Sequence, residues 1–241
     1  MRTLIVSDIH ANAAALDAVF SAAEEDGVID QVWCLGDTVG YGPYPMACLE
    51  RLWAADAVCI SGNHDAGAVG RIGLEEFSHY AAIACRWTMT QLTDQARDFL
   101  SGLPTLLVKD PFTLVHGSPR NPMWEYVTGY PQATEVWERT DTPGVFLGHT
   151  HFQFACEAGR GLEQPGPNGL FVPMTSSRVV INPGSVGQPR DRDPRAAYAV
   201  YDDEADSVML RRTWYDISAT QRAMAEAGLP DALITRLSTG S

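Results

Sequence analysis

The sequence predicts an α/β fold of two stacked, mixed β-sheets with helices on their outer faces. Two observations predict it: short apolar runs alternate with stretches of helical period in the N-terminal part, and short strands dominate the rest. The alternation is typical of βαβ units, which build parallel strands joined by right-handed crossovers. Eight or more later strands cannot easily extend that first sheet, so we expect a second sheet packed against it.

The N-terminal part contains the expected βαβ units. Its elements are, in order, strand 3–7 (TLIVS), helix 11–25 (ANAAALDAVFSAAEE), strand 31–35 (QVWCL), helix 43–55 (PYPMACLERLWAA) and strand 57–61 (AVCIS). A helical stretch follows from about Glu75 to Leu100, where alanines, Leu92 and Phe99 have helix-compatible spacing. Pro104 then restarts extended structure.

The later part consists mainly of short runs bounded by Gly, Pro or Asp, which are typical of strands. The expected strands cover residues 105–109, 112–116, 144–148, 152–157, 169–173, 178–182, 195–202 and 208–215. A polar turn from Asp203 to Asp206 joins the last two and indicates a hairpin. The loop-like segment 157–168 is expected to be a surface excursion, and a helix near 219–227 ends the chain.

Composition places the chain among ordinary globular proteins. Its 241 residues are 45% hydrophobic and 20% charged, which excludes collagen-like, low-complexity and disordered classes. No segment approaches the roughly 18 apolar residues of a membrane span. The first residues, MRTLIVSDIH, have too short an apolar run for a signal peptide. We therefore expect one domain over residues 1–241, in the cytoplasm and without a membrane partner, and the oligomeric state stays open.

Charge and cysteine usage narrow the range of partners. With 17 basic and 30 acidic residues the net charge is −13, so long nucleic acids are unfavourable partners. An anionic small molecule stays open, because metal ions or arginines can reverse the local sign. The five cysteines are odd in number, form no C-x-x-C pair and lie mostly in apolar runs. We expect them to be reduced core residues.

Five of the six histidines stand in polar clusters at predicted strand ends, and only His79 is left over as an ordinary residue. In extended backbone residues i and i+2 project to the same side, so the pairs Asp8/His10 and His149/His151 can each present two ligands to one point. Asp37 follows a strand and could bridge two ions with its two oxygens. The candidate ligands are Asp8, His10, Asp37, Asn63, His116, His149 and His151.

Seven ligands are too many for one ion and suit two ions about 3.5–4 Å apart. The set contains no sulfur, which argues against a structural zinc site or an iron–sulfur cluster. Imidazole with carboxylate suits Mn, Fe, Ni, Co or Zn.

These residues resemble the calcineurin-like metallophosphoesterases, whose pattern is D-x-H, G-D, G-N-H-[DE], H and G-H-x-H. The chain has all five blocks in order, at 8–10, 36–37, 62–65, 116 and 148–151. The run 182–198 also looks like the compact bacterial branch of that family. The resemblance implies a two-sheet sandwich and two divalent ions, with Mn first among them. It also implies hydrolysis of a phosphate ester through in-line attack by a metal-bridging hydroxide.

The resemblance also implies roles for single residues. Asp8, His10 and His151 would hold one ion, Asn63, His116 and His149 the other, and Asp37 would bridge them. His64 would act as general acid or transition-state stabiliser. Asp65 would hold the His64 imidazole by a hydrogen bond, or cap a helix instead.

Substrate contacts have two interpretations each. Asn12 could contact phosphate or cap the helix that follows it. Arg120 and Arg190 could bind a phosphoryl oxygen or be ordinary surface residues. Three aromatic residues could line a pocket or only pack their loops: Tyr41, Trp124 and Tyr126.

The sequence leaves several functions open. Relatives that are protein phosphatases carry an arginine immediately before G-N-H, where this chain has Ser61. Because a diester carries one charge less than a monoester, Ser61 favours a phosphodiester or another small phosphorylated compound such as a nucleotide. The alternatives are a phosphomonoesterase or protein phosphatase, a non-catalytic interaction scaffold, and a metal-binding regulatory module.

Overall fold

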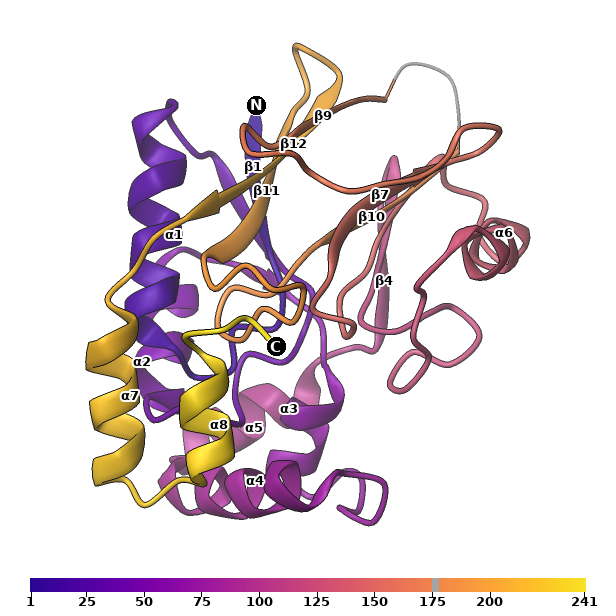
Figure 1. Ribbon diagram of the computed structural model, residues 1–241. Coiled ribbons are helices and arrows are strands. Elements are labelled where there is room, and N and C mark those ends of the chain that lie inside the picture. Colours follow the sequence, from indigo (N-terminus) through magenta and orange to yellow (C-terminus); the bar gives the residue numbers. More distant parts are fainter. Residues whose placement is uncertain (175–177) are drawn as a thin grey trace.

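Two six-stranded β-sheets form the centre of the protein in a computed structural model, which describes residues 1–174 and 178–241 (Figure 1). The first sheet contains, in spatial order, β3 (Val58–Cys59), β2 (Gln31–Cys34), β1 (Arg2–Val6), β11 (Ala196–Asp202), β12 (Ser207–Thr213) and β9 (Leu170–Pro173). The second contains β4 (Leu106–Lys109), β5 (Phe112–Val115), β6 (Gly144–Phe146), β10 (Val179–Pro183), β7 (Gln153–Glu157) and β8 (Gly161–Glu163). The predicted fold class is confirmed.

Strand pairing agrees with the expected topology. β1, β2 and β3 are parallel, as βαβ units require, whereas β11 runs antiparallel to β1. In the second sheet β5, β6 and β10 are parallel, and β4 and β7 are antiparallel to their neighbours. The hairpin predicted at Asp203–Asp206 joins β11 to β12. The excursion at 157–168 is only partly a loop, because β8 within it pairs with β7 at the edge of the sheet.

The helices are α1 (Ala13–Glu25), α2 (Pro45–Ala54), α3 (Asn63–Ala68), α4 (His79–Gln91), α5 (Asp94–Gly102), α6 (Tyr130–Glu138), α7 (Ile217–Glu226) and α8 (Asp231–Arg236). The single helix expected from Glu75 to Leu100 is wrong. Leu92 adopts extended backbone, with ψ of 133°, and the Thr93 hydroxyl caps a new helix by accepting from the amide of Ala96. Helices α6 and α8 were not predicted, and α3 was expected only in the interpretation that Asp65 caps a helix.

Successive side chains of a strand point to opposite faces of the sheet, and this divides the hydrophobic core into layers. In β1, Leu4 and Val6 face α1 and α2, whereas Ile5 points between the two sheets and packs with residues such as Phe146. Helix α6 covers the outer face of the second sheet, through Val136 and its neighbours. The site described below therefore rests on strands that are packed on both faces.

The structure also bears on the expected state of the cysteines and on membrane-spanning helices. All five cysteines are buried and free, as predicted. In the described parts of the chain no helix is both long and apolar enough to cross a lipid bilayer. Helices α3, α4, α5 and α8 gather at one end of the molecule, at the bottom of Figure 1.

Candidate metal centre and active site

The structure brings all seven predicted metal ligands together. Each lies shortly after the carboxyl end of a strand, which is the usual place for a site in such sheets. All are buried, with no more than 4% of any of them exposed. Six of them, together with His64, make overlapping groups in which the ligand atoms lie within 4.8 Å of one another: Asp8, His10 and His151; His10, Asp37 and His64; Asp37, His116 and His149. The seventh, Asn63, has Oδ1 3.3 Å from Nε2 of His116.

The backbone at five of these ligands is left-handed and not extended, so the geometric reason given for the i, i+2 pairs is wrong. The φ angles are 52° at Asp8, 48° at His10, 54° at Asp37, 65° at His149 and 61° at His151. Side chains other than glycine rarely adopt this region, and such strain persists where the surroundings impose it. Here the amides of Asp8 and His10 donate to the carbonyls of the loop after β2, at 3.0 and 2.9 Å. The loops therefore hold each other in the strained form.

The imidazoles are oriented so that their lone pairs converge. His10, His116 and His151 each have Nδ1 at hydrogen-bond distance from a backbone carbonyl, those of Val39, Leu35 and Gln188 respectively. A carbonyl only accepts, so Nδ1 carries a proton in all three rings. In the neutral rings of His10 and His151, Nε2 therefore presents its lone pair to the centre. Nε2 of His10 and Nε2 of His151 lie 3.1 Å apart. Two facing acceptors at this distance need a cation between them.

The two carboxylates lie among these lone pairs. Oδ1 of Asp37 accepts from the backbone amide of His64 at 2.8 Å. Oδ2 of Asp37 lies 3.7 Å from Nε2 of His10 and 3.4 Å from Nε2 of His116, so it faces both ligand groups. Of the two oxygens expected to bridge ions, Oδ2 is thus the one that faces both ligand groups, whereas Oδ1 accepts from the backbone. Oδ1 of Asp8 is buried without a hydrogen-bond partner in the described residues.

Burial dominates the protonation of the centre. It lowers the pKa values of His10 and His151 well below their ordinary range and raises the pKa of Asp8 to about 7. Burial also opposes the charge of His116, but the carboxylates of Asp37 and Asp8 outweigh it and raise its pKa to about 10. Buried carboxylates without a cation thus recruit a proton. The same electrostatics, with oxygen and imidazole donors, fit divalent transition-metal ions.

His64 and Asp65 differ from their predicted relation. Asp65 accepts from the backbone amides of Gly62 and Val39, at 3.0 and 3.1 Å, and so caps the first turn of α3. Of the two interpretations of Asp65, the helix cap is confirmed and the hydrogen bond with His64 is wrong, and Nδ1 of His64 has no partner among the described residues. Packing orients the ring instead, with Tyr41 at 4.3 Å and Phe77 at 5.0 Å between ring centroids. Burial lowers the pKa of His64 to about 4.

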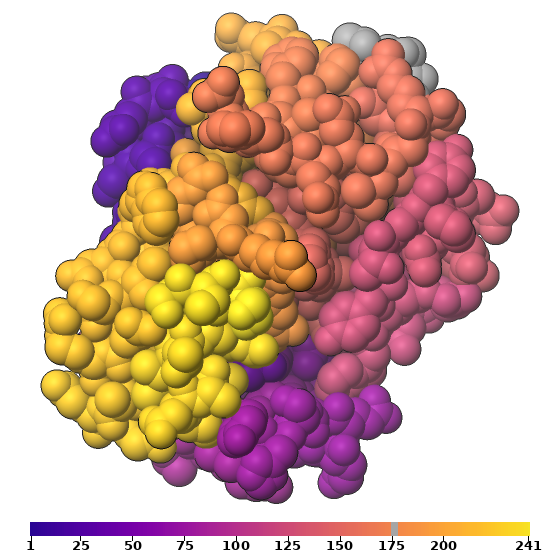
Figure 2. All heavy atoms as spheres, viewed as in Figure 1, coloured from indigo at the N-terminus to yellow at the C-terminus, as the bar shows by residue number. Residues whose placement is uncertain are grey.

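A cavity of about 230 Å³ opens onto this centre. The predicted wall residues Tyr41, Trp124 and Tyr126 all line it, and the Tyr126 ring stacks on His149 with centroids 4.3 Å apart. Figure 2 shows the hollow where the yellow C-terminal segment, the purple helices and the pink loops meet. Sequence reasoning missed Phe77 and Arg236, which also line it, because neither stands near a motif.

Of the three predicted substrate residues only Arg190 lines the cavity. Asn12 caps α1 instead: Oδ1 accepts from the amide of Ala15 and the hydroxyl of Thr220, and Nδ2 donates to the carbonyl of Gly187. Of the two interpretations of Asn12, the helix cap is confirmed and the phosphate contact is wrong, because its polar atoms bond within the protein.

The predicted role of Arg120 is also wrong. Its guanidinium is half exposed and pairs with Glu125 and Glu135, outside the cavity that holds the metal ligands. Two carboxylates satisfy its charge, so Arg120 has little left to offer a phosphate.

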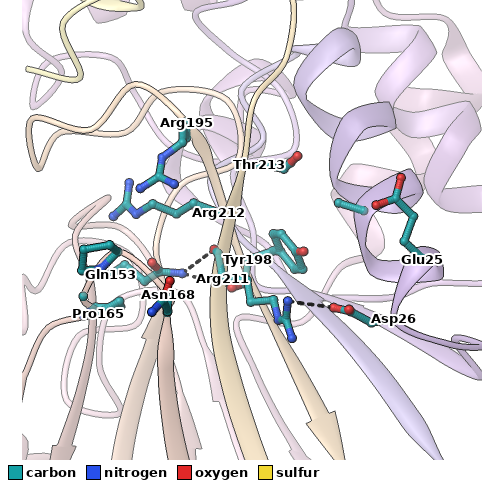
Figure 3. A pocket seen from close by; sticks show the side chains of 14 residues that line it. Glu25, Asp26, Gln153, Pro165, Asn168, Arg195, Tyr198, Arg211, Arg212 and Thr213 are labelled. Atoms are coloured by element: carbon teal, nitrogen blue, oxygen red, sulfur yellow. Dashed lines mark hydrogen bonds and ion pairs between the residues drawn. The ribbon is translucent and has the colours of Figure 1, made fainter.

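A larger cavity, of about 500 Å³, lies elsewhere, beside β12 and the C-terminal end of α1 (Figure 3). It contains none of the metal ligands. Its three arginines are each paired with a carboxylate: Arg195 with Asp193, Arg211 with Asp26, and Arg212 with Asp191. Cavity size therefore does not identify the site here, whereas the convergent ligands do.

Gly62 is expected to be essential to the centre. A Cβ at this position would lie 2.1 Å from Oδ1 of Asp37 and 2.4 Å from the Asp37 amide. Gly62→Ala should displace Asp37, lose bound metal and destabilise the fold by about 1–3 kcal/mol. Thermal unfolding and metal analysis measure both effects. Gly102→Ala is the matched control, since no atom lies within 4 Å of its Cβ position. Wild-type metal binding in Gly62→Ala would contradict the assignment.

Comparison with known proteins agrees with this geometry. The sequence model of the calcineurin-like phosphoesterase superfamily domain matches residues 1–206. The chain therefore belongs to this family of metallophosphoesterases, whose members hydrolyse phosphate esters and typically bind divalent metal ions.

Two relatives match nearly the whole chain, and a third matches about half of it. The crystal structure of a metallophosphoesterase from Sphaerobacter thermophilus superposes with a TM-score of 0.91 and covers 100% of this chain and 99% of that chain. The two sequences are 42% identical. An uncharacterized protein of Methanocaldococcus jannaschii is 34% identical over 243 residues, 98% of this chain and 97% of its own. A symmetrical bis(5'-nucleosyl)-tetraphosphatase of Edwardsiella ictaluri is 29% identical over 147 residues, 56% of this chain and 50% of the relative.

Proposed function

We propose that this protein is a phosphoesterase that uses two divalent metal ions to hydrolyse a phosphodiester or another small phosphorylated compound, such as a nucleotide. The observation that carries the proposal is the cluster of converging lone pairs and buried carboxylates. Nε2 of His10 faces Nε2 of His151 at 3.1 Å, and Oδ2 of Asp37 lies between His10 and His116. Such a cluster is unstable without positive charge.

The ligands divide into two sets around Asp37. Asp8, His10 and His151 would hold one ion, and Asn63, His116 and His149 the other, with Asp37 shared through Oδ2. The unpartnered Oδ1 of Asp8 and Nε2 of His149 fit this division. Bound ions, with Mn proposed first and Fe, Ni, Co or Zn as alternatives, would lower the pKa of a shared water toward about 7 and polarise the phosphoryl oxygens.

His64 and Arg190 act on the substrate from the cavity walls. His64 lines the cavity beside the metal ligands, where its ring, kept neutral by burial, can donate a hydrogen bond to the leaving oxygen. Arg190 lines the same cavity and can donate to a phosphoryl oxygen. The aromatic walls offer stacking surfaces for a base or sugar.

Two observations support a diester or nucleotide substrate. Ser61 is fully buried and donates to the Gly62 carbonyl, so the position before G-N-H supplies no charge for a dianionic monoester. The partial match to a bis(5'-nucleosyl)-tetraphosphatase supports a nucleotide. A monoesterase is the second candidate, because Arg190 and Arg236 bring positive charge to the cavity by another route. A cytoplasmic location stays a prediction.

The test is hydrolysis of an aryl phosphodiester against the matching monoester, with added Mn²⁺ and Asp37→Asn as blank. We expect diester turnover that is higher than monoester turnover and absent from the blank. Preference for the monoester would replace the diesterase by a phosphatase. Absence of turnover on both, with metal bound, would contradict the proposal and favour an interaction scaffold or a regulatory metal site.

A further inference from the structure

Two arginines from distant parts of the chain meet on the wall of the metal cavity. Arg190 follows β10, and Arg236 is the last residue of α8. Both donate to the same atom, Oε1 of Gln188, at 3.0 and 3.2 Å. The backbone carbonyl of Gln188 in turn accepts from Nδ1 of His151, a metal ligand. The two guanidiniums therefore lie beside the metal centre.

Besides Gln188, Arg190 donates to the Tyr41 hydroxyl and Arg236 to the backbone oxygen of Ser241. Within the parts of the chain that the structure describes, neither guanidinium forms an ion pair with a carboxylate, although the exposed Glu76 lies on the same cavity. Nε of Arg190 is buried without a hydrogen-bond partner. In the larger cavity, by contrast, every arginine has its carboxylate. Two partly buried like charges that share the Gln188 oxygen repel each other, and an anion between them would relieve this repulsion.

The C-terminal segment is built to hold Arg236 there. Helices α7 and α8 pack through Met224 and Leu233 against Ala81 of α4 and against Tyr41, whose hydroxyl accepts from Arg190 at 3.3 Å. After α8 the Gly240 carbonyl accepts from the amide of Arg192 at 2.7 Å, which ties the tail to the loop carrying Arg190. This segment lies beyond residue 206, where the family match ends.

We propose that Arg190 and Arg236 form a subsite for a second phosphate group, next to the phosphate held at the metal centre. The inference rests on the proposed function and makes it more specific, since the substrate class becomes compounds with two directly linked phosphates. Guanidinium forks match phosphate oxygens in pairs, and donors remain on both side chains. The aromatic walls formed by Phe77, Trp124 and Tyr126 would receive the organic part.

The first test measures binding of inorganic pyrophosphate and of orthophosphate by calorimetry, with the Mn²⁺-loaded protein. Pyrophosphate should bind at least about tenfold more tightly than orthophosphate. Arg236→Gln should lose about tenfold in pyrophosphate affinity and a clearly smaller factor in orthophosphate affinity. Arg236→Lys keeps the positive charge but loses the two-pronged guanidinium, so its pyrophosphate affinity should lie between those of the wild type and Arg236→Gln. Arg222→Gln, an exposed arginine of α7 bonded to Ser218, is the matched control and should change neither.

The outcomes separate the subsite from the proposed function. If Arg236→Gln loses affinity equally for pyrophosphate and orthophosphate, or loses no affinity for either, the subsite is overturned. This holds even if the protein hydrolyses a diester with one phosphate. Selective loss of pyrophosphate binding in a protein that hydrolyses no ester would retain the subsite and reject the enzyme. Unfolding temperatures of Arg236→Gln and Arg222→Gln within a few degrees of each other exclude general destabilisation as the cause.

Discussion

Replacing Asp37 with Asn is expected to abolish hydrolysis and to lower the number of bound metal ions. Oδ2 of Asp37 is the one atom that faces both ligand groups, and its negative charge is what draws cations into a buried site. Replacing a residue that merely orients a ligand costs about 10–100-fold in metal affinity or activity. Loss of the shared ligand itself should therefore lower kcat/KM more than about 100-fold, measured with an aryl phosphodiester and Mn²⁺.

Asp98→Asn on the exposed face of α5 is the matched control, since it removes the same charge far from the centre. It should bind metal and turn over substrate as the wild type does. An Asp37→Asn protein that retained both metal and rate would show that the carboxylate is not shared, and the proposed division of ligands would fail.

The second large effect is expected from His64→Gln. If the ring donates to the leaving oxygen, kcat should fall by about 10²–10⁴, with metal content unchanged. The loss should be larger for an alkoxide leaving group than for p-nitrophenolate, because a poor leaving group depends more on the donated proton. Kinetics with a series of diesters of increasing leaving-group pKa measure this dependence.

His64 also belongs to a group of possible ligands with His10 and Asp37, which gives the experiment a second arm. Loss of metal from His64→Gln would make the residue a ligand. An unchanged rate with every leaving group would remove it from the mechanism altogether.

The fold was largely predictable because the spacing of hydrophobic residues indicates which faces of each strand and helix are buried. β1 has buried residues on both faces, which indicates a central strand packed between two hydrophobic layers. The hairpin of β11 and β12 was predicted from the polar turn between them. The break at Leu92 and Thr93 was missed because an apolar spacing that suits one helix also suits two. Helix α8 was missed because six residues give too little periodicity.

The metal ligands were predictable because strand ends meet at one edge and their chemistry is distinctive. The left-handed backbone at Asp8 and His10 was not, since it comes from hydrogen bonds with the distant loop after β2. Asn12 and Arg120 were assigned to substrate because partners such as Thr220 and Glu135 lie far away in sequence. Arg236 carried no local signal, because only the packing of the C-terminal segment brings it to the cavity.

The most direct test of the central claim is the number of metal ions per chain after loading with Mn²⁺ and desalting, measured by elemental analysis against protein concentration. The converging lone pairs and shared carboxylate predict two ions per wild-type chain, and fewer in Asp37→Asn. A wild-type protein that holds one ion or none under conditions that saturate binding would contradict the two-ion site on which the proposed chemistry depends.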